Sequence, residues 1–365
     1  MNNSSCVNAL KVLSTAMVYF CHSWITCYNT FEFNAHGWQR LLITPAWGGV
    51  WIFLVIGGYL AAYGFCGGKY DLTLGGVLLY YKNRVVKILI PTWIFISLEF
   101  LLIYQDKMIT WTDAFRFLTC TFNGEGSPVD GIGATWYVFI VMWLYFLTPL
   151  FIYFLNKLGE RTSINEFRIC LIALFVVCFL GGLYRVVSFF FLDWYNWTYA
   201  NVLGCVDLFI AGIITFRMTN CLPILSVSMV KKLRLCVILM LCILIVACSD
   251  FGSLIPIGSA LYQYIWPSAY LILSSTLLFL YAYKTESTQN TLKTNAKCFV
   301  DFISPYSFAY YLWHSSILMY ISAIVKISNN NTRFLATIAL GILVTSYISF
   351  LMTKMNNGII KTLLK

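Results

Sequence analysis

Long apolar runs separated by short polar segments cover the whole chain. Each run has about 20 mostly apolar residues, the length that an α-helix needs to cross the hydrocarbon core of a membrane. No segment alternates between apolar and polar residues over its length, as the strands of a membrane barrel would. The pattern therefore predicts an all-α, polytopic bundle of about ten transmembrane helices, at about residues 7–28, 46–66, 86–105, 134–156, 167–190, 197–217, 232–249, 262–283, 303–326 and 333–353.

The composition supports an integral membrane protein. Of the 365 residues, 60% are hydrophobic and 10% are charged, whereas soluble domains average about 25% charged residues. No polar block is large enough for a soluble domain, so we expect a single transmembrane domain over residues 1–365. The first apolar run has no basic region before it and no small-residue cleavage site after it, so we expect it to stay as an anchor.

The basic residues indicate an orientation rather than a nucleic-acid partner. The net charge is +10, but lysine and arginine fall singly or in short clusters between the apolar runs. With the N-terminus inside, 18 of the 24 basic residues lie on the inner side, and the longest outer loop, 106–133, carries four acidic and two basic residues. We predict that both termini are cytoplasmic. Most of the 13 cysteines lie in apolar runs, where we expect them to pack as small apolar residues without a redox role.

Ionisable residues at the depth of a predicted span are few, and a charge there is costly, so each is a candidate for function. His22 in the first predicted helix and His314 in the ninth are two of the three histidines. A single such histidine is equally consistent with a hydrogen bond between helices, but two in one bundle favour function. The other ionisable residues at this depth are Glu99, Arg185 and Asp207, and the last two can pair across a polar cavity between consecutive helices.

Basic residues also stand near the predicted cytoplasmic ends. Lys11 lies eleven residues before His22, which places it roughly 16 Å lower on nearly the same helix face. Arg84 and Lys87 form an i, i+3 pair just before Pro91. Positive-inside anchoring alone would also account for Arg84 and Lys87, and Lys11 alone would be a lysine that snorkels at the flank of its helix.

Taken together, these features resemble the acyltransferase-3 family, ten-helix membrane enzymes that acylate bacterial surface glycans. The family's first helix has an arginine and a histidine separated by ten residues, and Lys11 and His22 have this spacing with lysine in place of arginine. Residues 49–59, whose glycines we expect to pack against neighbouring helices, resemble the family's second helix. Arg84 and Lys87 resemble the arginine pair before its third helix, again with one lysine.

Two later segments extend the resemblance. Trp136 and Tyr137 resemble the aromatic start of the family's next long helix, and residues 307–314 resemble its late serine, tyrosine and histidine element. The resulting site prediction has three groups: catalytic His22 and His314; donor-binding Lys11, Arg84 and Lys87; and acceptor-side or pocket residues Trp136, Tyr137, Tyr310, Trp313, Arg185 and Asp207.

The resemblance implies an O-acyltransferase, foremost an O-acetyltransferase, that moves an acyl group from acyl-CoA to a sugar hydroxyl of a cell-envelope polysaccharide or its lipid-linked precursor. Acetyl-CoA is then a substrate, and we expect no permanently bound cofactor and no metal site. The expected partners are acyl-CoA, the glycan and lipids of a bacterial cytoplasmic membrane, with the protein a monomer or dimer.

In this interpretation the basic residues bind phosphates of coenzyme A, His22 is the base that removes the hydroxyl proton or the group that passes the acyl group on, and His314 serves the acceptor side. The alternative is a polytopic transporter or lipid-linked glycan flippase, whose intramembrane charges line a path.

Overall fold

Helices account for 89% of the described chain, and the described ranges contain no strand, which confirms the predicted all-α class. The computed structural model describes residues 4–43, 46–102, 110–119, 135–161, 165–192, 197–198, 201–223, 225–249, 260–283 and 295–364. The α-helices are α1 (Ser4–Phe31), α2 (Ala46–Cys66), α3 (Leu74–Arg84), α4 (Ile90–Leu102), α5 (Trp111–Thr119), α6 (Trp136–Arg161), α7 (Glu166–Phe191), α8 (Val202–Met218), α9 (Val227–Cys248), α10 (Ala260–Leu280), α11 (Asn295–Ile303), α12 (Ser307–Ile324) and α13 (Asn330–Leu363).

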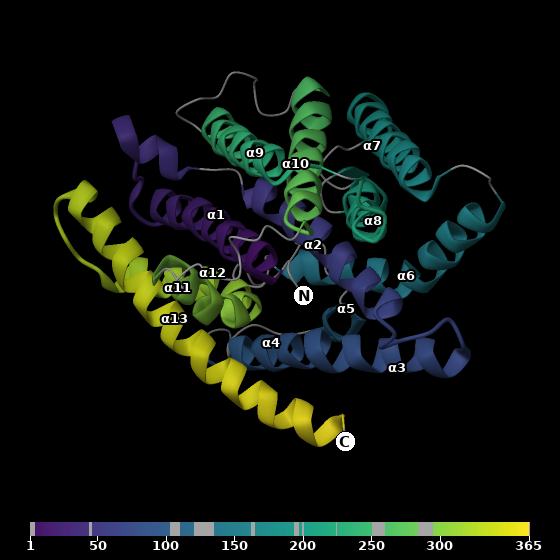
Figure 1. Ribbon diagram of the computed structural model, residues 1–365. Helices are drawn as coiled ribbons and strands as arrows, with labels where there is room; N and C mark the ends of the chain where they lie inside the picture. The colour runs from purple at the N-terminus through teal and green to yellow at the C-terminus, as the bar shows by residue number, and fades with distance from the viewer. Residues whose placement is uncertain are drawn as a thin grey trace.

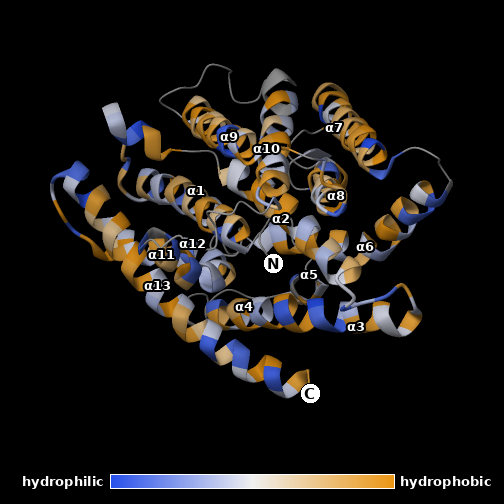
Figure 2. Cartoon of the chain, in the orientation of Figure 1, coloured by the Kyte–Doolittle hydropathy of each residue, from blue (hydrophilic) through white to orange (hydrophobic). Residues whose placement is uncertain are grey.

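The described part of each of the ten predicted segments is helical, apart from one to three residues near an end of four of them: 201, 249, 281–283 and 325–326. Within the described ranges, five stretches are long and apolar enough to cross a membrane: Ser4–Phe31, Gly37–Cys66, Trp136–Glu160, Glu166–Phe191 and Asn330–Leu363. Figure 2 shows apolar residues along most of the bundle and polar residues gathered toward helix ends, as on α13. These features indicate a multi-pass membrane protein.

Helix α2 lies in the middle of the bundle, against α1, α6, α8 and α10 (Figure 1). Its contact with α8 depends on two glycines. A Cβ at Gly58 would lie 1.9 Å from the carbonyl oxygen of Phe209, and one at Gly212 would lie 2.0 Å from that of Val55. Both distances are far below van der Waals contact, so the two backbones can approach this closely only because neither position has a side chain.

Helices α1 and α12 pack side by side and run in the same direction. Nδ1 of His22 contacts Nε2 of His314, and the Thr30 hydroxyl contacts that of Ser322; both pairs are 292 residues apart. Helix α13 runs the opposite way, and the Tyr19 hydroxyl on α1 donates to the carbonyl of Ile338 on α13. In the predicted topology α1 and α12 are the first and ninth spans. Odd-numbered spans all cross the membrane in the same direction, so the prediction and the parallel packing agree.

Helices α3 and α4 continue one another through a π-helical turn, Val85–Leu89 (Figure 1). Pro91 has no N–H, so it cannot donate to the carbonyl of Lys87 as a regular α-helix would require. The N–H of Ile90 bonds instead to the carbonyl of Val85, five residues back. Such turns occur frequently at functional sites, and this one holds part of the predicted donor-binding segment.

Candidate active site

The two intramembrane histidines meet between α1 and α12. Nδ1 of His22 lies 2.5 Å from Nε2 of His314, and Nδ1 of His314 lies 2.6 Å from the carbonyl oxygen of Tyr311. The ring planes differ by 17° and the ring centres are 4.8 Å apart, so the rings meet edge to edge through their nitrogens. His314 is 1% exposed, whereas His22 keeps part of its surface accessible. His22 is therefore the more accessible ring of the pair.

An aromatic cluster adjoins the pair. The Tyr311 ring lies 5.8 Å from the His314 ring and packs edge-on against Tyr137 of α6 and Phe53 of α2, at 5.4 and 6.4 Å between centres. Trp136 packs on Tyr137 at 6.4 Å. The structure thus brings the predicted Tyr137 close to the histidines. Tyr311 and Phe53 were not predicted as site residues, because their place beside the histidines depends on which helices are neighbours.

The other two predicted aromatic residues of α12 have different surroundings. Tyr310 packs edge-on against Tyr19 of α1 and borders an apolar cavity of about 620 Å³ between α1, α11, α12 and α13. Trp313 is 8% exposed and packs edge-on against Phe95 of α4. Tyr310 therefore has open space beside it, whereas Trp313 mainly joins two helices. Their stacking on a sugar stays a prediction.

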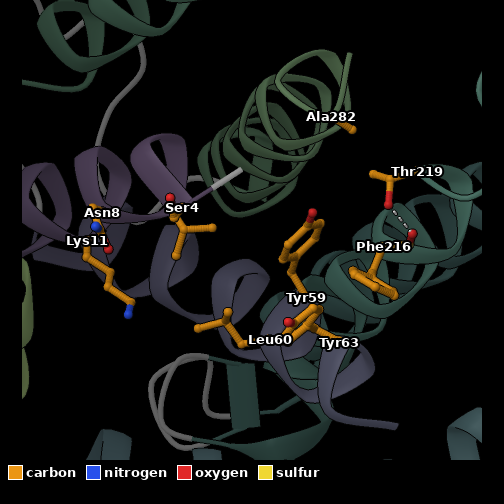
Figure 3. A pocket seen from close by; sticks show the side chains of 10 residues that line it. Ser4, Asn8, Lys11, Tyr59, Leu60, Tyr63, Phe216, Thr219 and Ala282 are labelled. Atoms are coloured by element: carbon orange, nitrogen blue, oxygen red, sulfur yellow. Dashed lines mark hydrogen bonds between the residues drawn. The ribbon is translucent and has the colours of Figure 1, made fainter. Parts of the chain in front are cut away.

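A cavity of about 340 Å³ lies at the other end of the α1 face that carries His22. Figure 3 shows Lys11 of α1 on one side, Thr219, which directly follows α8, on the other, and Tyr59 and Tyr63 of α2 between them. Because α1 is helical from Ser4 to Phe31, Lys11 lies about 16 Å along the helix from His22, as the spacing predicts.

The other predicted donor-binding residues form a basic cluster. The Arg84 guanidinium lies over the rings of Tyr80 and Tyr145, at 4.9 and 4.6 Å from their centres, and its buried Nε has no hydrogen-bond partner among the described groups. Lys87 is exposed and within electrostatic range of Arg84 and of Lys69, which follows α2. Lys69 was not predicted as a site residue. Its place in the same predicted inner loop as Arg84 was the one feature of the sequence that could have indicated it.

Arg185 and Asp207 form a buried, two-armed ion pair between α7 and α8. The two nitrogen–oxygen distances are 2.9 and 2.7 Å, and both side chains are 2% exposed. The Arg185 Nη1 also donates to the carbonyl of Gly204. The expected pairing is confirmed, but through direct bonds rather than across a cavity. Their pocket role stays a prediction, and the contacts are those of a link between two helices.

The fold and site define a multi-pass helical membrane protein with a histidine pair between its first helix and a late one. A family model described as an acyltransferase domain matches residues 5–354, nearly the whole chain. The protein belongs to this family, acyltransferase-3, and is a membrane acyltransferase. No curated protein and no solved structure matches the chain.

Proposed function

We propose that the protein is an acyl-CoA-dependent O-acyltransferase, specifically an O-acetyltransferase, acting on a sugar hydroxyl of a cell-envelope polysaccharide or its lipid-linked precursor. The observation that carries the proposal is the partly accessible imidazole of His22, bonded to His314 inside the bundle. A cavity with a lysine in its wall lies about 16 Å from it along α1. This arrangement offers a base inside the membrane and a binding place for an anionic donor near the helix ends.

The proposed topology has ten helices across the cytoplasmic membrane of a bacterium, with both termini inside. The cavity beside Lys11 is bordered by the start of α1 and by the ends of α2, α8 and α10. In this topology all four of these helix termini are cytoplasmic, and so is the basic cluster of Lys69, Arg84 and Lys87. A donor from the cytoplasm would meet these basic residues first.

Coenzyme A carries its phosphates at one end and its thioester at the other, joined by a flexible arm. The phosphates would form charge-assisted hydrogen bonds with Arg84, Lys87, Lys69 and Lys11. The rings of Tyr80 and Tyr145 hold the Arg84 guanidinium in place, and its Nε has no partner among the described groups. The arm would then carry the thioester along α1 toward His22.

His22 would act as general base. As the acceptor oxygen attacks the thioester carbonyl, the hydroxyl proton moves to the free ring nitrogen of His22. The new carbon–oxygen bond is retained and the carbon–sulfur bond breaks. The departing thiolate takes the proton back from His22, which leaves a sugar ester, free coenzyme A and a neutral imidazole. A positioned base of this kind contributes about 10²–10⁴ in rate.

The test uses purified protein in liposomes with labelled acetyl-CoA and a glycan or glycolipid fraction from bacterial envelopes. We expect base-labile label on the glycan. A transporter or flippase would instead move the glycan across the bilayer without labelling it, and that result would overturn the proposal. The direct bond between Arg185 and Asp207 favours the enzyme over a transporter, because these two charges are paired with each other instead of lining a translocation path. Competition by acyl-CoA of increasing chain length would establish whether acetyl is preferred.

A further inference from the structure

We infer that His314 is a positioning residue: it accepts a hydrogen bond from Nδ1 of His22 and so leaves Nε2 of His22 as the base nitrogen. The catalytic consequence rests on the proposed function. The proton arrangement itself does not, because it follows from contacts within this chain alone.

The carbonyl of Tyr311 fixes the proton on His314. A carbonyl oxygen only accepts hydrogen bonds, so Nδ1 of His314, 2.6 Å away, carries a hydrogen. A neutral imidazole has one N–H, so Nε2 of His314 then holds a lone pair. A second proton would make a buried cation, and within the described ranges neither ring bonds to a carboxylate. An unpaired buried charge is costly, so the neutral form is the resting state.

The lone pair on His314 in turn fixes the proton on His22. Nδ1 of His22 lies 2.5 Å from Nε2 of His314, and two lone pairs would repel at this distance. Nδ1 of His22 therefore donates, and its Nε2 holds the lone pair. The edge-to-edge arrangement of the rings suits such a bond, since the N–H lies in the ring plane. Without this partner, the His22 ring could carry its hydrogen on either nitrogen.

This arrangement helps the reaction without contact between His314 and substrate. When Nε2 of His22 takes the hydroxyl proton, its Nδ1–H becomes a charge-assisted donor, and its bond to His314 strengthens. Both nitrogens of His314 are already engaged and its ring is 1% exposed, so neither nitrogen is free for a sugar. The inference thus replaces the acceptor-side role that the sequence suggested for His314.

The first experiment observes the protons directly. With only three histidines in the chain, nitrogen-15 labelling of histidine gives three imidazole signal sets, assigned with His36→Gln and His22→Gln. In the ligand-free protein we expect His22 and His314 both to carry the hydrogen on Nδ1. Hydrogen on Nε2 of His22, or an even mixture of its two forms, would overturn the inference. Neither result bears on whether the protein transfers acyl groups.

The second experiment compares His314→Leu with His314→Gln, because a glutamine amide oxygen can accept from His22 and a leucine cannot. We expect His314→Leu to lower kcat by about 10- to 100-fold for both acetyl transfer and slow acetyl-CoA hydrolysis, because both use His22 and both lose its charge-assisted hydrogen bond. The KM for acetyl-CoA should stay within about twofold. His314→Gln should keep about tenfold more kcat than His314→Leu.

Three results would contradict this role. Equal kcat in the leucine and glutamine variants would mean that the acceptor atom does not matter. A change in KM alone would make His314 a binding residue. Loss of transfer with hydrolysis preserved would restore the acceptor-side role. Elution as a single species in detergent is required of each variant.

Discussion

Arg84 and Lys87 differ in their surroundings, although both were predicted to bind the donor. Arg84 lies over two tyrosine rings with a buried Nε, whereas Lys87 is exposed on the π-helical turn. A guanidinium held by aromatic faces loses less conformational freedom on binding phosphate than a free lysine side chain does. The two residues should therefore contribute unequally.

We expect Arg84→Ala to raise the KM for acetyl-CoA by about tenfold, because one charge-assisted contact of about 1.5 kcal/mol is lost. Lys87→Ala should raise it less, and Lys87→Arg should be tolerated. Steady-state kinetics in liposomes measure each effect. Lys82→Ala, an exposed basic residue of the same helix, is the matched control. Unchanged donor affinity in both alanine variants would mean that Arg84 and Lys87 serve only to orient the protein in the membrane.

His22→Ala tests the base itself. Acetyl transfer should fall by about 10²–10⁴, while the amount of protein in the membrane stays unchanged, because α1 loses one bond to α12 but keeps its other contacts, such as that between Thr30 and Ser322. His36→Ala, on an exposed segment before residues 37–42, should keep full activity. Activity of the His22 variant at the level of the His36 control would rule out the proposed mechanism.

The ion pair of Arg185 and Asp207 should matter for stability. Removing one partner leaves the other charge buried, so Asp207→Asn or Arg185→Met should each cost about 3–5 kcal/mol. The double variant should cost less than the sum, because no buried charge remains. Thermal unfolding in detergent, with activity measured on the surviving fraction, tests this. Full stability with selective loss of acceptor affinity would support the pocket role instead.

At the scale of helices, the crossing of α2 and α8 is fixed by backbone contact at Gly58 and Gly212. We expect Gly58→Ala to separate the two helices and to destabilise the protein by about 1–3 kcal/mol, the usual cost of overpacking. Gly358→Ala is the matched control, since a Cβ there would meet no atom within 4 Å. Equal thermal stability of the two variants would show that the contact can relax.

The long helices were predictable and several shorter features were not. Apolar length alone located α1, α2, α6 and α7 to within about five residues at either end, whereas α13 continues ten residues beyond its predicted end. The short helices α3, α5 and α11 carry no such run, and the π turn at Val85–Leu89 depends on a hydrogen bond that Pro91 cannot make. Most of the predicted outer loop, 106–133, lies outside the described residues, which include only 110–119 of it.

At the scale of the whole molecule, the proposed orientation can be tested with cysteines. Cys66 at the end of α2 and Cys298 on α11 are exposed, and both are cytoplasmic in the proposed topology. In single-cysteine variants, a membrane-impermeant maleimide should label neither in intact spheroplasts and both after the membrane is opened. Cysteine at Asn34, exposed beyond the end of α1, should be labelled in both cases. Labelling of Cys66 in intact spheroplasts would show that the orientation is the opposite of the one proposed.

The packing of the helices explains why only part of the site could be predicted from the sequence. His22, His314 and Arg84 stood out because ionisable groups are rare and costly in apolar runs. Their grouping could not be read from the chain, since contact between His22 and His314 depends on α1 and α12 being parallel neighbours. The sequence likewise could not distinguish a direct Arg185–Asp207 bond from two charges facing a cavity.

The distance between the two histidines along the chain also governs when a newly made protein becomes active. His22 enters the membrane with the first helix, but its partner is translated 292 residues later, when most of the bundle has been inserted. A nascent chain that ends before α12 already has Lys11, Arg84 and Lys87, the proposed donor-binding residues, but lacks the partner of His22. In the proposed mechanism such an unfinished copy would use acetyl-CoA only slowly, and full activity would begin when α12 packs beside α1, before α13 completes the bundle.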